Sequence, residues 1–185
     1  YNIVLASKSP RRRELLKELG LEFEINALSV DEDYPTDLPA DQIARYLSEK
    51  KADAYLPTLS DKELIITADT VVICDDVVLG KPKDYADAMH MLMSLSGRCH
   101  QVVTGVTLLS AQKRVSFSVS TEVYFAEISE DEARYYVDHY SPFDKAGAYG
   151  IQEWIGYVAV HKIEGSFYNV MGLPLHQLYK ELKAF

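Results

Sequence analysis

The sequence has few cysteines, no membrane-spanning run and no secretion signal. Cys74 and Cys99 are the only cysteines, and two unpatterned cysteines are too few for a disulfide scaffold or a zinc site. We therefore expect a reducing compartment. No run of about 18 apolar residues and no signal-peptide pattern occurs, which predicts a cytoplasmic protein. The chain begins at Tyr1 without a methionine, so its native N-terminus stays open.

Basic residues are also scarce. The chain holds 19 Lys and Arg against 28 Asp and Glu, which gives a net charge of −9. This balance argues against binding to nucleic-acid polymers and to anionic membranes. No low-complexity linker and no internal repeat interrupts the 185 residues, of which 48% are hydrophobic. A chain of this length and composition predicts one globular domain over residues 1–185.

Helical and extended patterns alternate along the whole chain, which predicts an α/β fold. Strands are expected at residues 3–6, 22–27, 64–73, 101–109 and 113–126. Helices are expected at residues 10–19, 39–55, 85–95, 130–139 and 174–182. An acidic loop is expected at residues 31–35, and the glycine-rich, aromatic stretch before the last helix has no clear pattern.

Positive charge is concentrated at Ser9-Pro10-Arg11-Arg12-Arg13, directly after the apolar run Ile3-Val4-Leu5-Ala6. Ser9 fits a helix N-cap and Pro10 the first helical residue. A helix N-terminus already carries about half a positive charge, and each added cation costs roughly 0.3–1 kcal/mol. A bound phosphate would offset that cost, so replacing Arg11 or Arg12 by Ala should weaken anion binding without lowering stability. In the alternative interpretation the arginines are solvated and paired with Glu14, Glu18 and Glu22.

Asp69 is the only charged residue within the apolar stretch 64–73. A buried carboxylate without a partner costs several kcal/mol, so Asp69 must meet a cation, a metal or water. The Gly80-Lys81-Pro82 turn presents one lysine, and a purely structural Asp69–Lys81 ion pair is the alternative to a site. Lys51 lies at the margin of an apolar helix face, where a lysine can also simply lie along apolar surface.

A third segment, Asp144-Lys145-Ala146-Gly147-Ala148-Tyr149-Gly150-Ile151-Gln152, contains two glycines three residues apart. Glycine allows the backbone to approach a ligand closely, and the amide of Gln152 offers both a donor and an acceptor. The same pattern could belong to an ordinary connecting loop, so the segment alone is weak support for a site.

Together these segments resemble the Maf family of nucleoside triphosphate pyrophosphatases. The resemblance covers essentially the whole chain and rests on motifs in the expected order: Leu5-Ala6-Ser7-Lys8-Ser9-Pro10-Arg11-Arg12, Ala68-Asp69-Thr70-Val71-Val72, Gly80-Lys81-Pro82, Leu95-Ser96-Gly97 with His100, Val103-Thr104-Gly105-Val106, residues 144–152, and Asn169-Val170-Met171-Gly172-Leu173-Pro174. It implies a single α/β domain with an elongated mixed β-sheet flanked by helices, as in ITPase-like folds. It also implies a divalent-metal requirement and hydrolysis of a nucleoside triphosphate to monophosphate and pyrophosphate.

The resemblance also implies roles for particular residues. Asp69 matches the catalytic residue, and Asp69 with Glu32 would bind the metal. The positions that mark the dTTP/UTP-hydrolysing subgroup, rather than the one acting on 7-methylguanosine triphosphate, are matched by Arg11, Thr70 and Gln152. The phosphate-binding positions are matched by Ser7, Arg12, Lys51 and Lys81. Such an enzyme would hydrolyse dTTP and UTP and could clear non-standard nucleotides.

The chemistry of these side chains agrees with the implied reaction. Water must attack the α-phosphorus while arginine forks and lysine ammonium groups neutralise the triphosphate. An aspartate with a pKa of about 3.9 is a poor base for free water, and a bound cation would make that water more acidic. Oxygen ligands favour Mg²⁺ or Mn²⁺, and the lack of a His/Cys cluster argues against zinc. Gln152 can pair with the N3–H donor and a neighbouring carbonyl of uracil or thymine.

Two other functions stay open at this point. A nucleotide-binding regulator of septum formation and cell division would use the same anion pocket without turnover. Asp69 separates the two, because a pure binder of a polyanion gains nothing from a carboxylate beside the phosphates. A pyrophosphatase for a modified purine nucleotide would keep the chemistry and change the base pocket. The sequence decides neither the preferred metal nor the oligomeric state, so a homodimer stays open.

Overall fold

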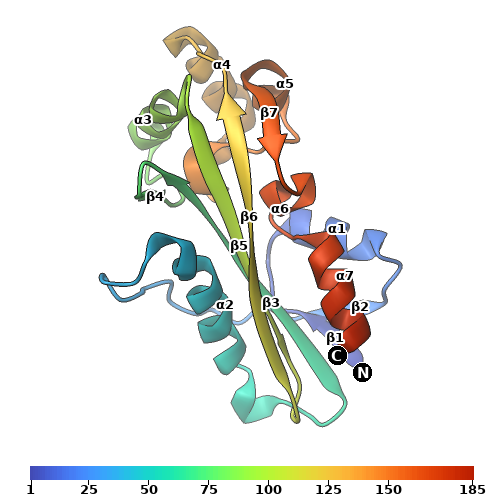
Figure 1. Cartoon of the computed structure of the whole chain (residues 1–185). Helices are drawn as coiled ribbons and strands as arrows, with labels where there is room; N and C mark the ends of the chain where they lie inside the picture. Colours follow the sequence, from blue (N-terminus) through green and yellow to red (C-terminus); the bar gives the residue numbers. More distant parts are fainter. The chain divides into compact units, whose positions relative to one another are not determined.

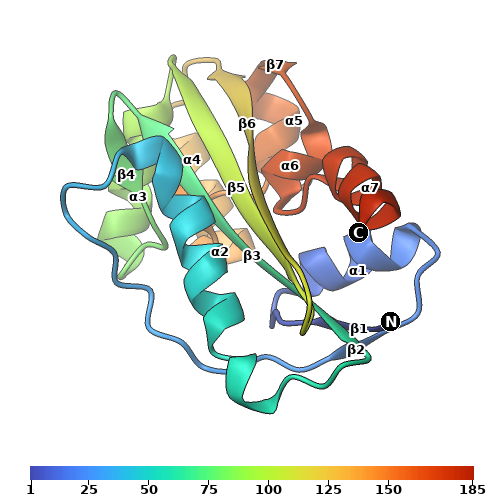
Figure 2. The ribbon, with the colours of Figure 1, turned by 60° about the horizontal axis from the view of Figure 1, so that its bottom comes forward.

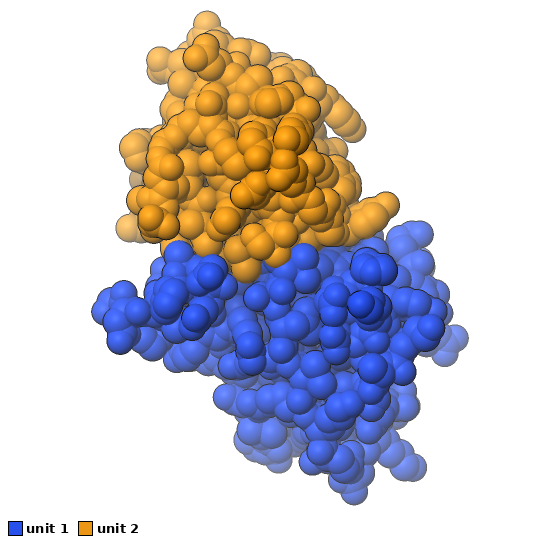
Figure 3. Space-filling view, viewed as in Figure 1, with its two compact units in different colours: residues 1–70, 104–119, 172–185 blue, residues 71–103, 120–171 orange.

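The computed structural model describes residues 1–185, which fold into two compact units (Figure 3). Unit 1 comprises residues 1–70, 104–119 and 172–185, and unit 2 comprises residues 71–103 and 120–171. A single domain over residues 1–185 stays a prediction. No helix is both long and apolar enough to cross a bilayer.

The strands form one mixed sheet in the order β2-β1-β3-β5-β6-β7, and β4 pairs with β3 (Figure 1). Their bounds are β1 Asn2–Leu5, β2 Phe23–Ile25, β3 Glu63–Cys74, β4 Val77–Leu79, β5 Cys99–Leu109, β6 Arg114–Phe125 and β7 Val160–Glu164. β1 runs parallel to β2 and β3, whereas β4 and β7 run antiparallel to their neighbours β3 and β6. The expected α/β class with a mixed sheet flanked by helices is confirmed.

Helices cover both faces of the sheet within unit 1. Figures 1 and 2 show α2 (Ile43–Asp53) on one face and α1 (Pro10–Glu18) with α7 (Leu175–Ala184) on the other. The helix expected at 39–55 is shorter, because it begins with the 3-10 turn η1 (Ala40–Gln42) and a second 3-10 turn, η2 (Leu56–Thr58), follows it. Pro57 has no N–H to donate to the carbonyl of Asp53 four residues earlier, so the α-helical hydrogen bonds cannot continue through it.

Unit 2 holds the larger group of short elements. Its helices are α3 (Tyr85–Leu95), α4 (Glu130–Tyr140), α5 (Trp154–Ala159) and α6 (Phe167–Met171), with the 3-10 turns η3 (Pro142–Asp144) and η4 (Ala146–Ala148). The apolar residues at helical spacing in α3 are buried as the sequence predicts: Ala88, Met91, Leu92 and Leu95. They pack into a core with aromatic side chains of α4 and the 144–152 segment. Cys74 is buried, Cys99 is exposed, and both are free thiols.

Candidate active site

The N-terminus of α1 follows the local prediction. Pro10 is the first helical residue, and the Ser9 side chain accepts the backbone N–H of Arg12 at 3.4 Å. The hydroxyl of Ser7 accepts the N–H of Ser9 at 3.2 Å, and Ser7 is buried with 8% of its surface exposed. Serine hydroxyls therefore fix the turn that leads from β1 into the helix carrying the arginines.

Arg12 extends from this turn and is bound to the protein through two N–H groups. Its Nε donates to the Gly172 carbonyl at 2.7 Å, and one Nη donates to the Thr70 hydroxyl at 3.0 Å. The pKa of Arg12 is lowered, mainly by burial and in smaller part by the positive charge of Arg11. The carboxylates of Asp69 and Glu32 act in the opposite direction. The alternative interpretation, in which the arginines are paired with Glu14, Glu18 and Glu22, is wrong for Arg12, whose partners are Gly172 and Thr70. Other N–H groups of the guanidinium are left for an anion.

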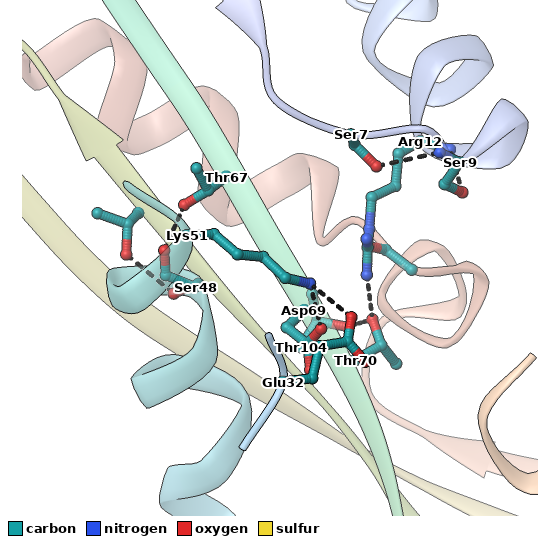
Figure 4. A network of polar contacts seen from close by, with 12 residues as sticks. Ser7, Ser9, Arg12, Glu32, Ser48, Lys51, Thr67, Asp69, Thr70 and Thr104 are labelled. Carbon is teal, nitrogen blue, oxygen red and sulfur yellow. Dashed lines mark hydrogen bonds and ion pairs between the residues drawn. The ribbon is translucent and has the colours of Figure 1, made fainter. Parts of the chain in front are cut away.

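The cation that meets Asp69 is Lys51. The Nζ of Lys51 lies 2.6 Å from an Asp69 carboxylate oxygen and 3.3 Å from a Glu32 carboxylate oxygen. The Lys51 and Asp69 side chains are only 19% and 12% exposed, whereas Glu32 is 50% exposed. Of the partners expected for Asp69, which were a cation, a metal or water, the structure shows a cation. Figure 4 shows both carboxylates directed at one ammonium group.

The position of Lys51 depends on how α2 packs against the sheet. A Cβ on Gly105 of β5 would lie 2.3 Å from the backbone carbon of Ala44, so only glycine allows this approach. One turn later, the Ser48 carbonyl accepts the Thr67 hydroxyl at 2.6 Å and the Ser48 hydroxyl bonds that of Thr107 at 2.9 Å. These contacts fix α2 against β3 and β5, and therefore set Lys51 opposite Asp69.

Neighbouring residues of β3 contribute to two groups of polar side chains, one around Lys51 and one around Arg12. Side chains alternate along an extended strand, so Thr67 and Asp69 face α2 whereas Thr70 faces α1. Thr70 bonds Arg12 and lies 2.8 Å from the hydroxyl of Thr104 on β5 (Figure 4). The residue-by-residue reasoning missed Thr104 and the Gly172 carbonyl. Both lie in motifs that were recognised only through the family resemblance.

The carboxylates of Asp69 and Glu32 fit a small divalent cation. They already converge on a positive group, the ammonium of Lys51, and they supply the oxygen donors that Mg²⁺ or Mn²⁺ prefers. No group of three or more His, Cys, Asp or Glu side chains could hold a metal ion by itself. The remaining ligands would therefore be oxygens of water and of a bound phosphate, as is common for Mg²⁺.

Two candidate residues, Lys81 and Gln152, belong to unit 2. Lys81 is exposed in the turn after β4, and the neighbouring Gly80 carbonyl accepts the Gly147 N–H at 3.1 Å. The turn that carries Lys81 is therefore joined to η4, which precedes Gln152 in the chain. The Oε1 atom of Gln152 is buried, and no protein group donates a hydrogen bond to it. An acceptor in this state fits a ligand N–H group.

All the other candidate residues lie in unit 1. The structure brings Lys51, Asp69 and Glu32 into one cluster, and Arg12 and Thr70 into another. Arg11 follows Pro10 in the first turn of α1 and is half-buried. Its charge acts on Arg12, which places it beside the same anion-attracting turn.

Comparison with known proteins identifies the family. A family model described as Maf-like protein matches residues 2–185. The chain belongs to the Maf family. Among solved structures, the Ham1 protein of Staphylococcus aureus has a TM-score of 0.51 and 15% identity, covering 69% of this chain and 73% of that chain. At that identity the likeness concerns the fold alone.

Curated relatives of this Maf protein align over nearly their full length. A protein of Parabacteroides distasonis is 53% identical, and the alignment covers 100% of this chain and 96% of the relative. A protein of Bacteroides thetaiotaomicron is 54% identical, with 99% of this chain and 95% of the relative covered. Both relatives bear the name dTTP/UTP pyrophosphatase.

Proposed function

We propose that this Maf protein hydrolyses dTTP and UTP to the nucleoside monophosphate and pyrophosphate. The observation that carries the proposal is the buried Asp69 carboxylate, 2.6 Å from Lys51 and within electrostatic reach of Arg12. In a protein that only binds triphosphate, a carboxylate beside the cations would weaken the affinity for the phosphates. A hydrolase needs such a carboxylate to orient the attacking water and accept its proton. The names of the relatives agree with this reaction and with its substrates.

In the proposed reaction, a water oxygen attacks the α-phosphorus and the bond to the bridging oxygen of the β-phosphate breaks. The electron pair leaves with pyrophosphate, and Asp69 orients the water and accepts its proton. Positive side chains hold the phosphate oxygens, the arginines through forks and the lysines as point charges. These are Arg11, Arg12, Lys51 and Lys81, with the hydroxyl of Ser7 as a further donor. The assignments of Lys81 and Ser7 rest on side-chain chemistry and on the family resemblance.

Asp69 and Glu32 are the residues that would hold Mg²⁺ or Mn²⁺. When bound, the cation supplies charge neutralisation and a more acidic coordinated water. We place this activity in the cytoplasm, in agreement with the two free cysteines.

Gln152 is proposed to recognise the base. Its buried Oε1 atom would accept the N3–H of uracil or thymine, and its amide N–H would donate to an adjacent carbonyl. In neutral cytosine N3 is an acceptor and the donor is the neighbouring 4-amino group, so an Oε1 atom held opposite N3 would face an acceptor. Arg11 and Thr70 complete the specificity set by resemblance. The hydroxyl of Thr70 contacts Arg12 and Thr104, so Thr70 contributes mainly by holding Arg12.

The test is pyrophosphate release from a panel of common and modified nucleoside triphosphates, with Mg²⁺ or Mn²⁺, by wild type and Gln152→Glu. A carboxylate at this position cannot donate to a carbonyl, and an unpaired buried polar group costs about 1–3 kcal/mol. We expect kcat/KM for dTTP and UTP to fall roughly tenfold to a few hundredfold. Gln101→Glu, on an exposed position of β5, is the matched control and should leave the rates unchanged. Preference for a modified purine, or an unchanged dTTP-to-CTP ratio in Gln152→Glu, would contradict the assignment.

A further inference from the structure

The hydroxyl of Tyr136 lies between the two sides of the turn that carries Gln152. Tyr136 belongs to α4 and is fully buried. Its oxygen accepts the backbone N–H of Gly150 at 2.9 Å, and its O–H donates to a carboxylate oxygen of Glu153 at 2.8 Å. Gly150 and Glu153 flank Gln152 in the sequence. One hydroxyl group from a separate helix therefore bonds the backbone on one side of the candidate base-reading residue and a side chain on the other.

The turn itself is closely packed around Gly150. A Cβ on Gly150 would lie 2.6 Å from a Glu153 carboxylate oxygen and 3.1 Å from Nε2 of Gln152. Both amide and carboxylate therefore lie directly over the glycine backbone. A displacement of Gly150 by a few tenths of an ångström would move the surface on which the Gln152 amide rests.

The Tyr136 hydroxyl stays protonated, and the Glu153 carboxylate that it contacts has a lysine beside it. The carboxylate of Glu153 lies 3.6 Å from the Nζ of Lys145, and these side chains are 20% and 11% exposed. Burial raises the pKa of Tyr136, so its hydroxyl stays protonated and serves as donor and acceptor at once. The Gly150 N–H and the Glu153 carboxylate are thereby both satisfied by a single oxygen.

The Gln152 amide has no such internal restraint at its oxygen. Its buried Oε1 accepts no hydrogen bond from the protein, so its direction depends on the turn that carries it. We propose that Tyr136 is a positioning residue for base selection, which holds the Gln152 turn so that the amide meets the donor and acceptor edge of uracil or thymine. This inference rests on the proposed role of Gln152. Tyr136 does not touch the substrate.

Tyr149 offers a matched control in the same segment. It is buried, and its hydroxyl lies 2.5 Å from Nε2 of His100 rather than near Gln152. Its ring also packs edge-to-face on Phe125, with 5.0 Å between centroids. Tyr149→Phe and Tyr136→Phe each remove one buried hydroxyl and keep the ring. Only Tyr136→Phe removes the bridge across the Gln152 turn.

The experiment measures kcat and KM for dTTP and CTP with wild type, Tyr136→Phe, Tyr149→Phe and Gln152→Glu. We expect Tyr136→Phe to lower the dTTP-to-CTP ratio of kcat/KM about tenfold, mainly through a higher KM for dTTP. The kcat for dTTP should stay within about threefold, because the phosphate clamp and Asp69 are untouched. Tyr149→Phe should keep the ratio within about twofold of wild type. Glu153→Gln, which still offers an oxygen to Tyr136, should also keep it.

The outcomes separate this inference from the function on which it rests. A wild-type ratio in Tyr136→Phe, together with a collapsed ratio in Gln152→Glu, would overturn the role of Tyr136 and leave the proposed function standing. An equal loss in Tyr149→Phe would also overturn it, because the effect would then be a general loosening of the segment. If Tyr136→Phe fails to fold, Glu153→Ala removes the same bridge from the other side. An unchanged ratio in that variant would overturn the inference too.

Discussion

Replacing Asp69 by Asn should remove most turnover and leave the fold intact. The substitution keeps the size of the side chain and an oxygen that can accept from Lys51, whose Nζ lies 2.6 Å from the Asp69 carboxylate. It removes the negative charge that would hold a cation and accept a proton. Loss of general-base assistance typically costs 10²- to 10⁴-fold in rate, so we expect kcat to fall roughly within that range.

The effect on stability should be modest, because Lys51 keeps Glu32 at 3.3 Å as a second carboxylate. A hydrogen bond to a charged group contributes about 1.5–3 kcal/mol, and the Asn oxygen retains part of it. We therefore expect a loss of about 1–2 kcal/mol. For a chain of this size, that loss lowers the melting temperature by about 2–8 °C.

The assay is pyrophosphate release from dTTP by purified variants whose thermal melts are recorded in parallel. Asp53→Asn is the matched control, because it removes an exposed carboxylate paired with Arg114 at the end of the same helix as Lys51. Surface pairs contribute at most about 1 kcal/mol, so this control should retain wild-type turnover and nearly its melting temperature. Wild-type turnover in Asp69→Asn would refute the catalytic role and make the Lys51–Asp69 pair purely structural.

Two further predictions concern Arg12 and His100. Arg12→Ala should weaken nucleotide binding and lower stability by about 2–5 kcal/mol, because the loss of two hydrogen bonds of a charged group outweighs the gain at the helix terminus. Arg11→Ala should weaken binding without that loss of stability, and equal melting temperatures for the two variants would contradict this. Burial lowers the pKa of His100 to about 4, so between pH 6.5 and 4 the unfolded chain binds more protons than the folded one. The His100 contribution to the free energy of unfolding should fall by about 2 kcal/mol from pH 7 to pH 5. His100→Gln should lose this component in denaturant titrations at the two pH values, whereas His90→Gln, at an exposed position, should keep it.

Elements with strong local signals could be predicted from the sequence. The Ser9-Pro10 start of α1 and the Asp84 cap of α3 depend on side chains within one turn of the helix end. The long buried strand β3 follows from its unbroken apolar and β-branched residues. Local chemistry decides these elements, so the sequence is sufficient for them.

Short elements could not be predicted, because tertiary contacts stabilise them. Strand β4 has three residues and follows Asp75 and Asp76, whose φ values are 49° and 62°. The sequence there carries no period long enough to reveal the strand. Helix α5 and strand β7 lie in the glycine-rich, aromatic stretch, and they could not be predicted for the same reason.

The partners within the site show the same limit. The sequence requires a partner for Asp69, which could be a cation, a metal or water. It does not choose between Lys51 and Lys81, because the choice depends on how α2 packs on Gly105. The stability expected of Arg12→Ala from the helix terminus alone changes once its contacts are known. One of these contacts is with the Gly172 carbonyl, 160 residues away in the chain.

The most direct test of the proposed reaction is hydrolysis of dTTP in ¹⁸O-labelled water with Mg²⁺ or Mn²⁺, followed by mass spectrometry of both products. Attack of water on the α-phosphorus predicts one ¹⁸O atom in the thymidine monophosphate and none in the pyrophosphate. Label in the pyrophosphate would place the attack on the β-phosphorus. Release of diphosphate nucleotide with inorganic phosphate, or no product at all, would contradict the assignment of this Maf protein as a dTTP/UTP pyrophosphatase.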